Sequence, residues 1–246
     1  MRDYKVYQMD RRERLRYRLT GTLIIGVVLW IFFRTVWVLP AAPVATIFYM
    51  RKKRRQLLAR QTNELRRQFK EMLFALRDAL KTGNAPERAF AYACEEMEKL
   101  YGKDAMITGE LQVLLNREQL NIGIEHSMAD FAERSGIREI EFFGRILQIA
   151  KRRGGNVIEM VGDCTETISH LMETEEEIQM ILTGKVHEKR IMEKIPLFIV
   201  FYVSLFSPEM LNPLYESAGG RIIMAAAFVI YGAAVYWADR IVDIRV

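Results

Sequence analysis

Two long apolar blocks, one near each end of the chain, constrain the fold more than any other feature of this sequence. The first block covers residues 19–50 and the second covers residues 195–238. Lysine and arginine residues border both blocks, as they border membrane spans on the cytoplasmic side. The segment between the blocks, residues 51–194, is polar and amphipathic. We therefore predict a membrane protein in which a cytoplasmic domain lies between two transmembrane hairpins.

The positive charge is concentrated beside the apolar blocks. The net charge is +5, but residues 51–70 alone hold nine Lys and Arg residues against one acid. Such a run also occurs in nucleic-acid-binding proteins. Its position directly after an apolar block instead favours the cytoplasmic edge of a lipid bilayer, and we expect no nucleic-acid partner. Residues 1–18 and 239–246 are interpreted in the same way, as a basic cytoplasmic N-terminus and a cytoplasmic tail.

The N-terminal block is too long for one straight span and is interrupted by a charge at Arg34. One helix would place this arginine near the bilayer centre, which is unfavourable. A hairpin with arms 19–33 and 35–50 places Arg34 at the far side and both ends in the cytoplasm. Each arm is short of the roughly 20 residues that a span needs, so a full crossing and a shallow re-entrant hairpin both remain open.

The C-terminal block divides at a segment with turn chemistry, Ser207-Pro208-Glu209, Asn212-Pro213 and Gly219-Gly220. We expect one span from about Ile195 to Phe206 and another from Ile222 to Ala238. Residues 207–220 contain two glutamates and no lysine or arginine, whereas the other flanks are basic. The positive-inside rule therefore predicts that this loop is external.

Residues 51–194 show helical periodicity throughout, with apolar residues three and four positions apart. Gly83 and Gly136 are expected to end helices, and Asn84 and Glu87 have the spacing of a capping box. A second capping box is expected at Asn156, after Gly154-Gly155. We predict an all-α bundle of about six helices, with apolar stripes at the following positions: Leu65, Phe69, Met72, Leu73, Leu76, Leu80; Phe90, Cys94, Met97, Tyr101; Ile107, Leu111, Leu114, Leu115; Ile124, Met128, Phe131, Ala132; Ile140, Phe143, Ile146, Leu147, Ala150; Val161, Cys164, Ile168, Leu171, Ile178, Ile181.

Catalytic motifs are missing from the sequence. It has no His-Glu-x-x-His, Gly-x-Ser-x-Gly or P-loop motif, so we expect neither an enzyme nor a cofactor. Cys94 and Cys164 are expected to be buried core residues. The helical spacing of Asp163, Glu166, His170 and Glu173 could in principle hold a metal. No matching half-site accompanies it, so an ordinary polar helix face is the better interpretation.

Two charge clusters are the candidate partner-contact residues of the middle segment. One is the basic pair Arg152 and Arg153, and the other is the acidic run Glu175, Glu176 and Glu177. Such clusters more often only solvate a surface, but they also suit docking to a partner of opposite charge. Pro196, at the entry to the second apolar block, is a candidate hinge because proline removes one helical hydrogen bond.

Three sequence segments resemble one protein family. They are "LRDALKTGNAPERA" at residues 76–89, "FAERSG" at 131–136 with "IAKRRGGNVIE" at 149–159, and the tail elements Lys194-Ile195-Pro196, Ser207-Pro208-Glu209-Met210 and Gly219-Gly220-Arg221. In this order the chain resembles the type II secretion system F-domain family, the inner-membrane platform proteins. It is most similar to the single-domain subunits of Tad/Flp pilus systems.

The resemblance implies a non-catalytic platform in the inner (cytoplasmic) membrane, with both termini cytoplasmic. Its implied partners are a hexameric secretion ATPase, pilin, and a second F-domain subunit or another copy of itself. Its implied role is to couple the ATPase to extraction and assembly of pilin. The alternative is a small polytopic transporter or channel subunit with a regulatory cytoplasmic helical domain. The few polar residues inside the apolar blocks, mainly Arg34 and Ser204, disfavour that alternative.

Overall fold

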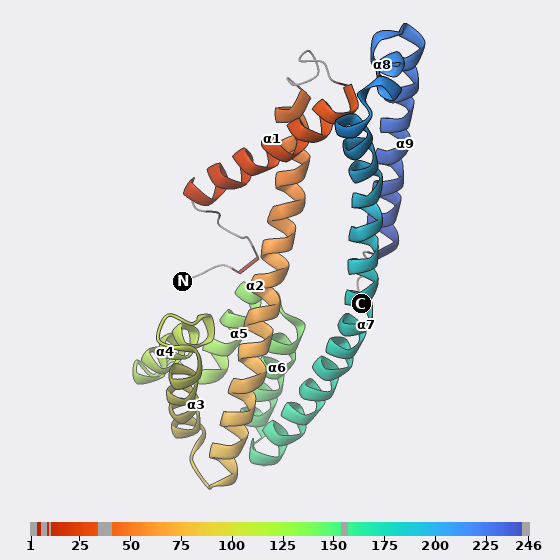
Figure 1. Ribbon diagram of the computed structural model, residues 1–246. Helices are drawn as coiled ribbons and strands as arrows, with labels where there is room; N and C mark the ends of the chain where they lie inside the picture. The colour runs from red at the N-terminus through yellow and green to blue at the C-terminus, as the bar shows by residue number, and fades with distance from the viewer. Residues whose placement is uncertain (1–3, 6–8, 10, 34–40, 154–156, 243–246) are drawn as a thin grey trace. The chain divides into compact units, whose positions relative to one another are not determined.

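The structure, a computed structural model, describes residues 4–5, 9, 11–33, 41–153 and 157–242, and within these ranges it is all helical (Figure 1). The described residues form nine α-helices and no strand, which confirms the predicted all-α class. They divide into two compact units. The first, here called the helical domain, comprises Met1–Gln8 and Arg54–Thr174. The second, the apolar unit, comprises Met9–Lys53 and Glu175–Val246.

Two of the helices, α2 and α7, belong to both units. Helix α2 has 41 residues and α7 has 50, and each continues through the boundary between the units as one helix. The remaining helices belong to one unit each. The bounds are α1 Arg11–Phe33, α2 Ala41–Lys81, α3 Pro86–Tyr101, α4 Met106–Gln119, α5 Ile124–Ser135, α6 Arg138–Arg153, α7 Val157–Phe206, α8 Pro208–Glu216 and α9 Ala218–Val242.

The helical domain is built from α3 to α6, the C-terminal part of α2 and the N-terminal part of α7, which confirms the expected number of helices for the part of the chain described. Helix α3 packs on α4, α4 on α5, and α5 on α6. Phe69 of α2 and Phe143 of α6 meet edge to face in the core, with ring centroids 5.8 Å apart. The predicted stripes supply the fully buried side chains, including Leu65, Met72, Leu73, Leu76, Met97, Ile107, Met128, Ile140, Val161 and Ile168.

The predicted stripe of α7 is wrong after Ile168. Leu171 is 56% exposed, and Met172 takes the buried position instead. The buried residues of this helix therefore continue at Cys164, Ile168 and Met172, which lie four residues apart on one face. Ile181 is exposed as well, because α7 has left the helical domain after Thr174.

Two predicted helix ends are confirmed and one predicted cap is wrong. Gly83 and Gly136 adopt positive φ angles of 87° and 64°, the left-handed conformation that glycine favours at a helix end. Asn84 does not cap α3, which starts at Pro86 after Ala85 and has no side-chain cap. The Asn84 amide instead donates to the carbonyl oxygen of Ala79 at 2.9 Å, and so satisfies the end of α2. The predicted cap at Asn156 lies outside the described residues.

The predicted division of the C-terminal block after Phe206 is found, where the chain bends by 103°, but most of residues 207–220 is helical rather than a loop. Pro208 begins α8 at its first position, where the missing N–H of proline costs no hydrogen bond. Ser217 alone separates α8 from α9. A side chain on Gly220 would come 2.5 Å from the Cα atom of Leu214, so this glycine permits close contact between the two helices rather than a wide turn.

Candidate membrane interface and partner surfaces

Helices α1 and α9 are each long and apolar enough to cross a membrane. They pack against each other within the apolar unit. The ring of Phe228 on α9 contacts the rings of Phe32 and Phe33 on α1, with centroids 5.3 and 5.7 Å apart. Tyr215 of α8 donates a hydrogen bond of 2.8 Å to the carbonyl oxygen of Ile31. The chain is therefore a membrane protein with one candidate span near each end.

A third crossing is available if α8 completes the span that α7 begins. The two helices pass the length and hydropathy test only together, and the chain bends by 103° between them. This geometry is that of a broken span or a re-entrant segment. Pro196 lies inside α7, which continues through it to Phe206; the hinge assigned to Pro196 stays a prediction.

The N-terminal turns of α2 pack antiparallel to α1. The hydroxyl groups of Thr22 and Thr46 lie 3.1 Å apart, and a side chain on Gly21 would meet the ring of Tyr49 at 2.9 Å. Further along the pair, the Lys53 ammonium lies 5.2 Å from the centre of the Tyr17 ring. The pairing thus brings the basic start of α1 beside the basic turn of α2. Arg34, which was predicted to lie at the tip of this hairpin, is outside the described residues.

An ionic cluster joins α2, α7 and α9 in the apolar unit. The Asp239 carboxylate accepts hydrogen bonds from both Lys52 and Lys189. Lys189 also lies 3.3 Å from Glu193, one turn along α7. The hydroxyl group of Tyr231 donates to the backbone oxygen of Glu193 at 2.8 Å. The charges within this cluster balance, since two lysines meet two carboxylates.

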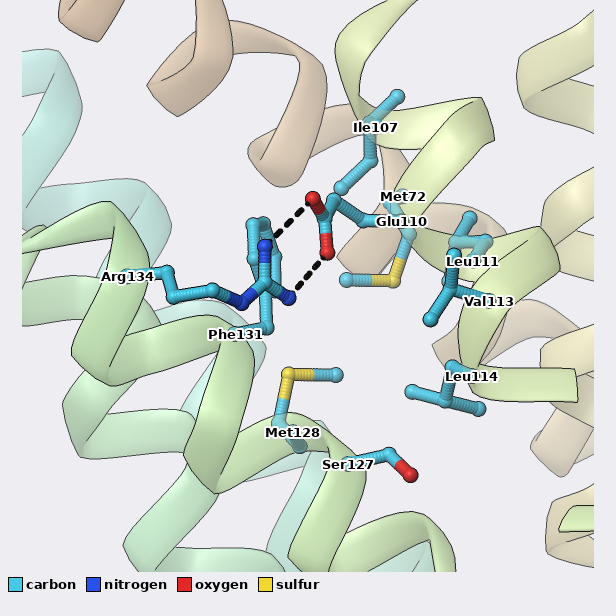
Figure 2. A pocket seen from close by; sticks show the side chains of 10 residues that line it. All are labelled: Met72, Ile107, Glu110, Leu111, Val113, Leu114, Ser127, Met128, Phe131 and Arg134. Carbon is cyan, nitrogen blue, oxygen red and sulfur yellow. Dashed lines mark hydrogen bonds and ion pairs between the residues drawn. The ribbon is translucent and has the colours of Figure 1, made fainter. Parts of the chain in front are cut away.

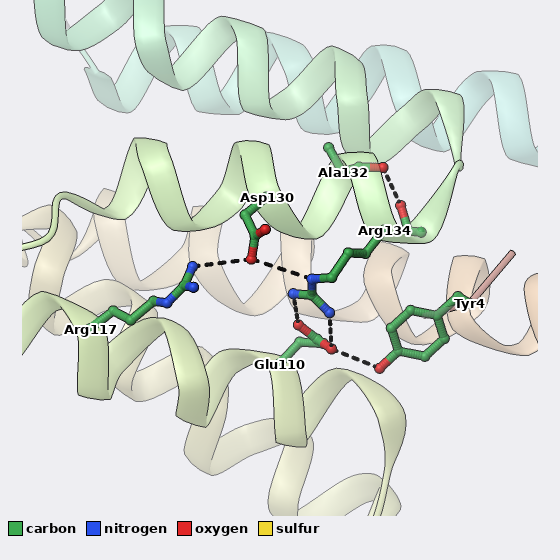
Figure 3. Close-up of polar contacts among 7 residues, drawn as sticks. Tyr4, Glu110, Arg117, Asp130, Ala132 and Arg134 are labelled. Carbon is green, nitrogen blue, oxygen red and sulfur yellow. Dashed lines mark hydrogen bonds and ion pairs between the residues drawn. The ribbon is translucent and has the colours of Figure 1, made fainter. Parts of the chain in front are cut away.

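A second ionic cluster lies in the helical domain, between α4 and α5 (Figure 3). The Arg134 guanidinium donates to both carboxylate oxygens of Glu110, at 2.8 and 2.5 Å, and to Asp130 at 3.3 Å. Arg117 donates to the same Asp130 oxygen at 3.1 Å. Tyr4, from the N-terminal segment, is 4% exposed and donates to Glu110 at 2.9 Å.

Every charge in this second cluster has a partner of opposite sign. The hydrogen bonds from Arg134 to Glu110 raise the pKa of the guanidinium above its usual value. Glu110 thus accepts hydrogen bonds from both Arg134 and Tyr4. The arrangement links Tyr4 and α5 to α4.

A small cavity lies beside the same cluster (Figure 2). Its volume is about 10 Å³, which suffices for about one water molecule and is far below the roughly 300 Å³ of a small-molecule site. The hydroxyl oxygen of Ser127, which lines it, is buried without a hydrogen-bond partner. This orphaned hydroxyl and the cavity together fit a single water. The other lining residues are Met72, Ile107, Glu110, Leu111, Val113, Leu114, Met128, Phe131 and Arg134.

Both cysteines are buried free thiols in the helical domain. Burial raises the pKa of the Cys164 thiol to about 12, and it also raises the pKa of Cys94. A thiol with such a pKa is a poor nucleophile at neutral pH, since the thiolate is the reactive form. In the described ranges no three His, Cys, Asp or Glu side chains come together as metal ligands. His170 lies between Glu166 and Glu173 on the exposed face of α7.

The predicted partner-contact residues fall in different units and are treated as separate surfaces. Glu176 and Glu177 are exposed on α7, where a partner can reach them, whereas Glu175 is half-buried. Arg152 and Arg153 form the end of α6, and their side chains lie outside the described part of the structure.

The sequence patterns missed both ionic clusters. Glu110 and Arg134 are 24 residues apart on different helices, and Lys52 and Asp239 are 187 residues apart. A local spacing pattern therefore cannot predict either pair. Tyr4 was also missed, because a single tyrosine in a charged N-terminal segment has no periodicity to place it. The one available signal was the presence of acids among apolar stripes, as at Glu110 beside Leu111.

Comparison of the chain with protein-family models, with curated proteins and with solved structures finds no match. Its function is therefore inferred from the residues and the geometry described above.

Proposed function

We propose that this protein is a non-catalytic platform subunit in the inner membrane of a Tad/type IV-like pilus or type II secretion machine. In this role it couples a cytoplasmic hexameric ATPase to the extraction and assembly of pilin. The observation that carries the proposal is the continuity of α2 and α7, each of which passes from the helical domain into the apolar unit without a loop. A movement applied to the domain would reach the membrane helices through two continuous helices.

The segments that resemble F-domain platform proteins support the same role. Residues 76–89 form the end of α2, its Gly83 cap and the start of α3, and residues 131–136 form the end of α5 at Gly136. In both places a helix ends at a left-handed glycine and the next begins within three residues. At residues 76–89 the resemblance expects a helix, a glycine turn and a new helix. The double glycine that it expects at 154–155 lies outside the described residues.

The charge distribution supports an orientation with both termini and the helical domain in the cytoplasm. Basic residues lie at 11–18 and 51–55, beside the α1 and α2 apolar turns, and Lys185, Lys189 and Lys194 precede the apolar end of α7. Residues 207–220 hold Glu209 and Glu216 and no basic residue. The positive-inside rule assigns the basic side to the cytoplasm.

The alternative of a transporter or channel subunit gains no specific support. A transport site needs polar residues near the middle of the spans. The ionic cluster around Asp239 instead lies three residues from the end of α9, beside the basic turn of α2. Thr22 and Thr46 bond to each other or to backbone oxygen.

Co-purification with the secretion ATPase tests the proposal. The full-length protein is expressed with a secretion ATPase of the same organism, solubilised in mild detergent and captured by an affinity tag. The ATPase should co-purify with the wild type. Glu176→Lys/Glu177→Lys should reduce the captured ATPase at equal platform protein, and Arg152→Glu/Arg153→Glu tests the second surface in the same way.

Matched controls separate a docking surface from a general charge effect. Asp104→Lys/Glu133→Lys and Arg88→Glu/Arg138→Glu change the same charge at other exposed positions, all in the helical domain. They should leave capture unchanged. If the wild type captures no ATPase, the platform role is wrong. If all variants capture it equally, only the assignment of Arg152, Arg153, Glu176 and Glu177 is wrong.

A further inference from the structure

The apolar part of α1 is shorter than the hydrocarbon core of a membrane. From Leu19 to Phe33 it measures about 22 Å at 1.5 Å per residue, whereas the core is about 30 Å thick. A shortfall of about 8 Å corresponds to roughly five residues. The turns that precede Leu19, which contain Arg14, Arg16 and Arg18, must therefore lie at the headgroup level or deeper if α1 crosses the bilayer.

The side chains of these turns are arranged for such a position. Leu15, Leu19 and Leu23 follow one another at intervals of four residues and are 60%, 64% and 69% exposed. The lipid-facing ridge of α1 thus continues into the arginine-rich turns. The hydroxyl groups of Thr20 and Thr22 donate to the backbone oxygens of Arg16 and Arg18, at 3.0 and 2.9 Å. Hydroxyl groups that are satisfied inside the helix can enter an apolar medium at little cost.

Three arginines of these turns have no acidic partner among the described residues. Arg14, Arg16 and Arg18 are exposed and form no ion pair within the part of the chain that the structure describes. Residues 11–18 hold five arginines and one acid, Glu13. Long arginine side chains beside an apolar helix face extend toward the nearest polar layer, where they meet phosphate.

Helix α2 adds further positive charge at the same place. The Lys53 ammonium lies on the Tyr17 ring of α1, so the basic turn 51–55 of α2 adjoins the basic turns of α1. Asp239, a carboxylate that also faces this turn of α2, is bound by Lys52 and Lys189. Guanidinium groups near a second cationic turn favour a phosphate ligand, which they can bind through two hydrogen bonds each.

We propose that the first two turns of α1, with Lys53 of α2, form a binding site for the headgroup phosphate of anionic phospholipids. Arg14 and Arg18, one turn apart, bind the phosphate, while Leu15 and Leu19 contact the acyl chains. This site goes beyond the platform role and requires only that α1 lies in a membrane. Its occupant is a lipid rather than free phosphate, because exposed Leu15 and Leu19 directly follow Arg14 and Arg18 and need an apolar partner.

Lipid retention by the full-length protein tests the site. The protein is purified in a neutral detergent, mixed with equal amounts of phosphatidylglycerol and phosphatidylcholine, and separated from free micelles by gel filtration. The bound lipids are then quantified. Phosphatidylglycerol should be enriched over phosphatidylcholine with the wild type. Arg14→Gln/Arg18→Gln should lose at least half of that enrichment, and Arg14→Lys/Arg18→Lys should keep more of it, since lysine retains the charge without the two-pronged hydrogen bonding.

The control and the melting temperature complete the experiment. Arg88→Gln/Arg138→Gln removes the same charge from exposed positions of the helical domain and should leave the enrichment unchanged. Phosphatidylglycerol should also raise the melting temperature of the wild type, and inorganic phosphate at equal concentration should not. Equal enrichment in the wild type and Arg14→Gln/Arg18→Gln, or full reproduction of the thermal shift by inorganic phosphate, overturns the lipid assignment. The platform role stands or falls separately, on capture of the ATPase.

Discussion

Arg134 of α5 donates two hydrogen bonds, of 2.8 and 2.5 Å, to the carboxylate of Glu110 of α4, and the pair is largely shielded from water. Removing one partner of a buried ion pair leaves an uncompensated charge. Glu110→Ala should therefore lower the free energy of unfolding of the helical domain by about 3 kcal/mol, the lower end of the range because Asp130 still contacts Arg134. Urea-dependent labelling of the buried thiols Cys94 and Cys164 measures this change.

The double variant Glu110→Leu/Arg134→Met distinguishes the pair from its surroundings. Replacing both charges with apolar side chains should recover most of the lost stability, because no unpaired charge remains. A double variant that is less stable than Glu110→Ala would show that Arg134 stabilises the domain mainly through its contact with Asp130, and not through Glu110.

Phe143 and its neighbour Phe142 provide a matched pair of core and surface rings. Phe143 is fully buried against Phe69, whereas Phe142 is 43% exposed. Phe143→Ala should cost about 3 to 5 kcal/mol. Phe142→Ala should cost less than about 1 kcal/mol, as surface substitutions usually do. The same labelling assay compares them, and equal losses would mean that the helical phase of α6 is wrong.

Glu125 should make the helical domain sensitive to acid. Burial alone would raise the pKa of its carboxyl group, but the hydrogen bond from Lys151 at 2.6 Å and nearby charges outweigh burial and lower it. A carboxyl group with a lowered pKa contributes stability above its unfolded value of about 4.3, and this is lost as pH falls through the folded pKa. The urea midpoint of the wild type should thus fall more between pH 6 and pH 3 than that of Glu125→Gln.

Exposed Glu133, on the same helix, is the control for this pH dependence. Glu133→Gln should retain the acid sensitivity of the wild type. At pH 7, Lys151→Met should cost at most about 1 kcal/mol, because the lysine is mostly exposed to solvent. An unchanged acid response in Glu125→Gln would assign the sensitivity to another carboxyl group.

The native thiols should resist alkylation in the folded protein. With a pKa of about 12, only about one Cys164 thiol in ten thousand is a thiolate at pH 8. A cysteine at Met180, an exposed position on the same helix, should react at least about 100 times faster. Mass spectrometry of the alkylated peptides gives both rates. Comparable rates would contradict the burial of Cys164.

The orientation across the membrane is tested by an impermeant thiol reagent on intact cells. In a variant without Cys94 and Cys164, Glu216→Cys should be labelled and Asn63→Cys should be labelled only after lysis. Both positions offer accessible side chains, since Glu216 and Asn63 are exposed. Labelling of Asn63→Cys in intact cells would place the helical domain outside and contradict the cytoplasmic assignment.

The sequence predicted the features that depend only on residues close together in the chain, such as the buried face of a helix and its end. Leu65, Phe69, Met72 and Leu76 are buried because a helix places them on one face, and Gly83 ends α2 because glycine adopts the left-handed conformation without strain. Leu171 shows the limit of this reasoning. Leucine and methionine at 171 and 172 both suit a core, and the face of α7 that carries Cys164 and Ile168 buries Met172.

The sequence could not predict relationships between distant segments. Asn84 fits a capping box by spacing, but its amide turns back to Ala79 because Pro86 already fixes the start of α3. The residues near Tyr4 do not predict its hydrogen bond to Glu110, which lies 106 positions away. The lipid-site arginines were recognised as a basic flank, while their closeness to Lys53 depends on how α1 and α2 pair.

Helices α2 and α7 cross the unit boundary without a break, and this restricts which insertions and deletions the chain can accept there. One residue added to α2 beside Lys53 would turn the following helix by about 100° and advance it by 1.5 Å, so that its buried face would point elsewhere. An insertion of seven residues, two full turns, nearly restores that phase. Substitutions at this boundary should therefore be accepted more readily than single-residue insertions or deletions.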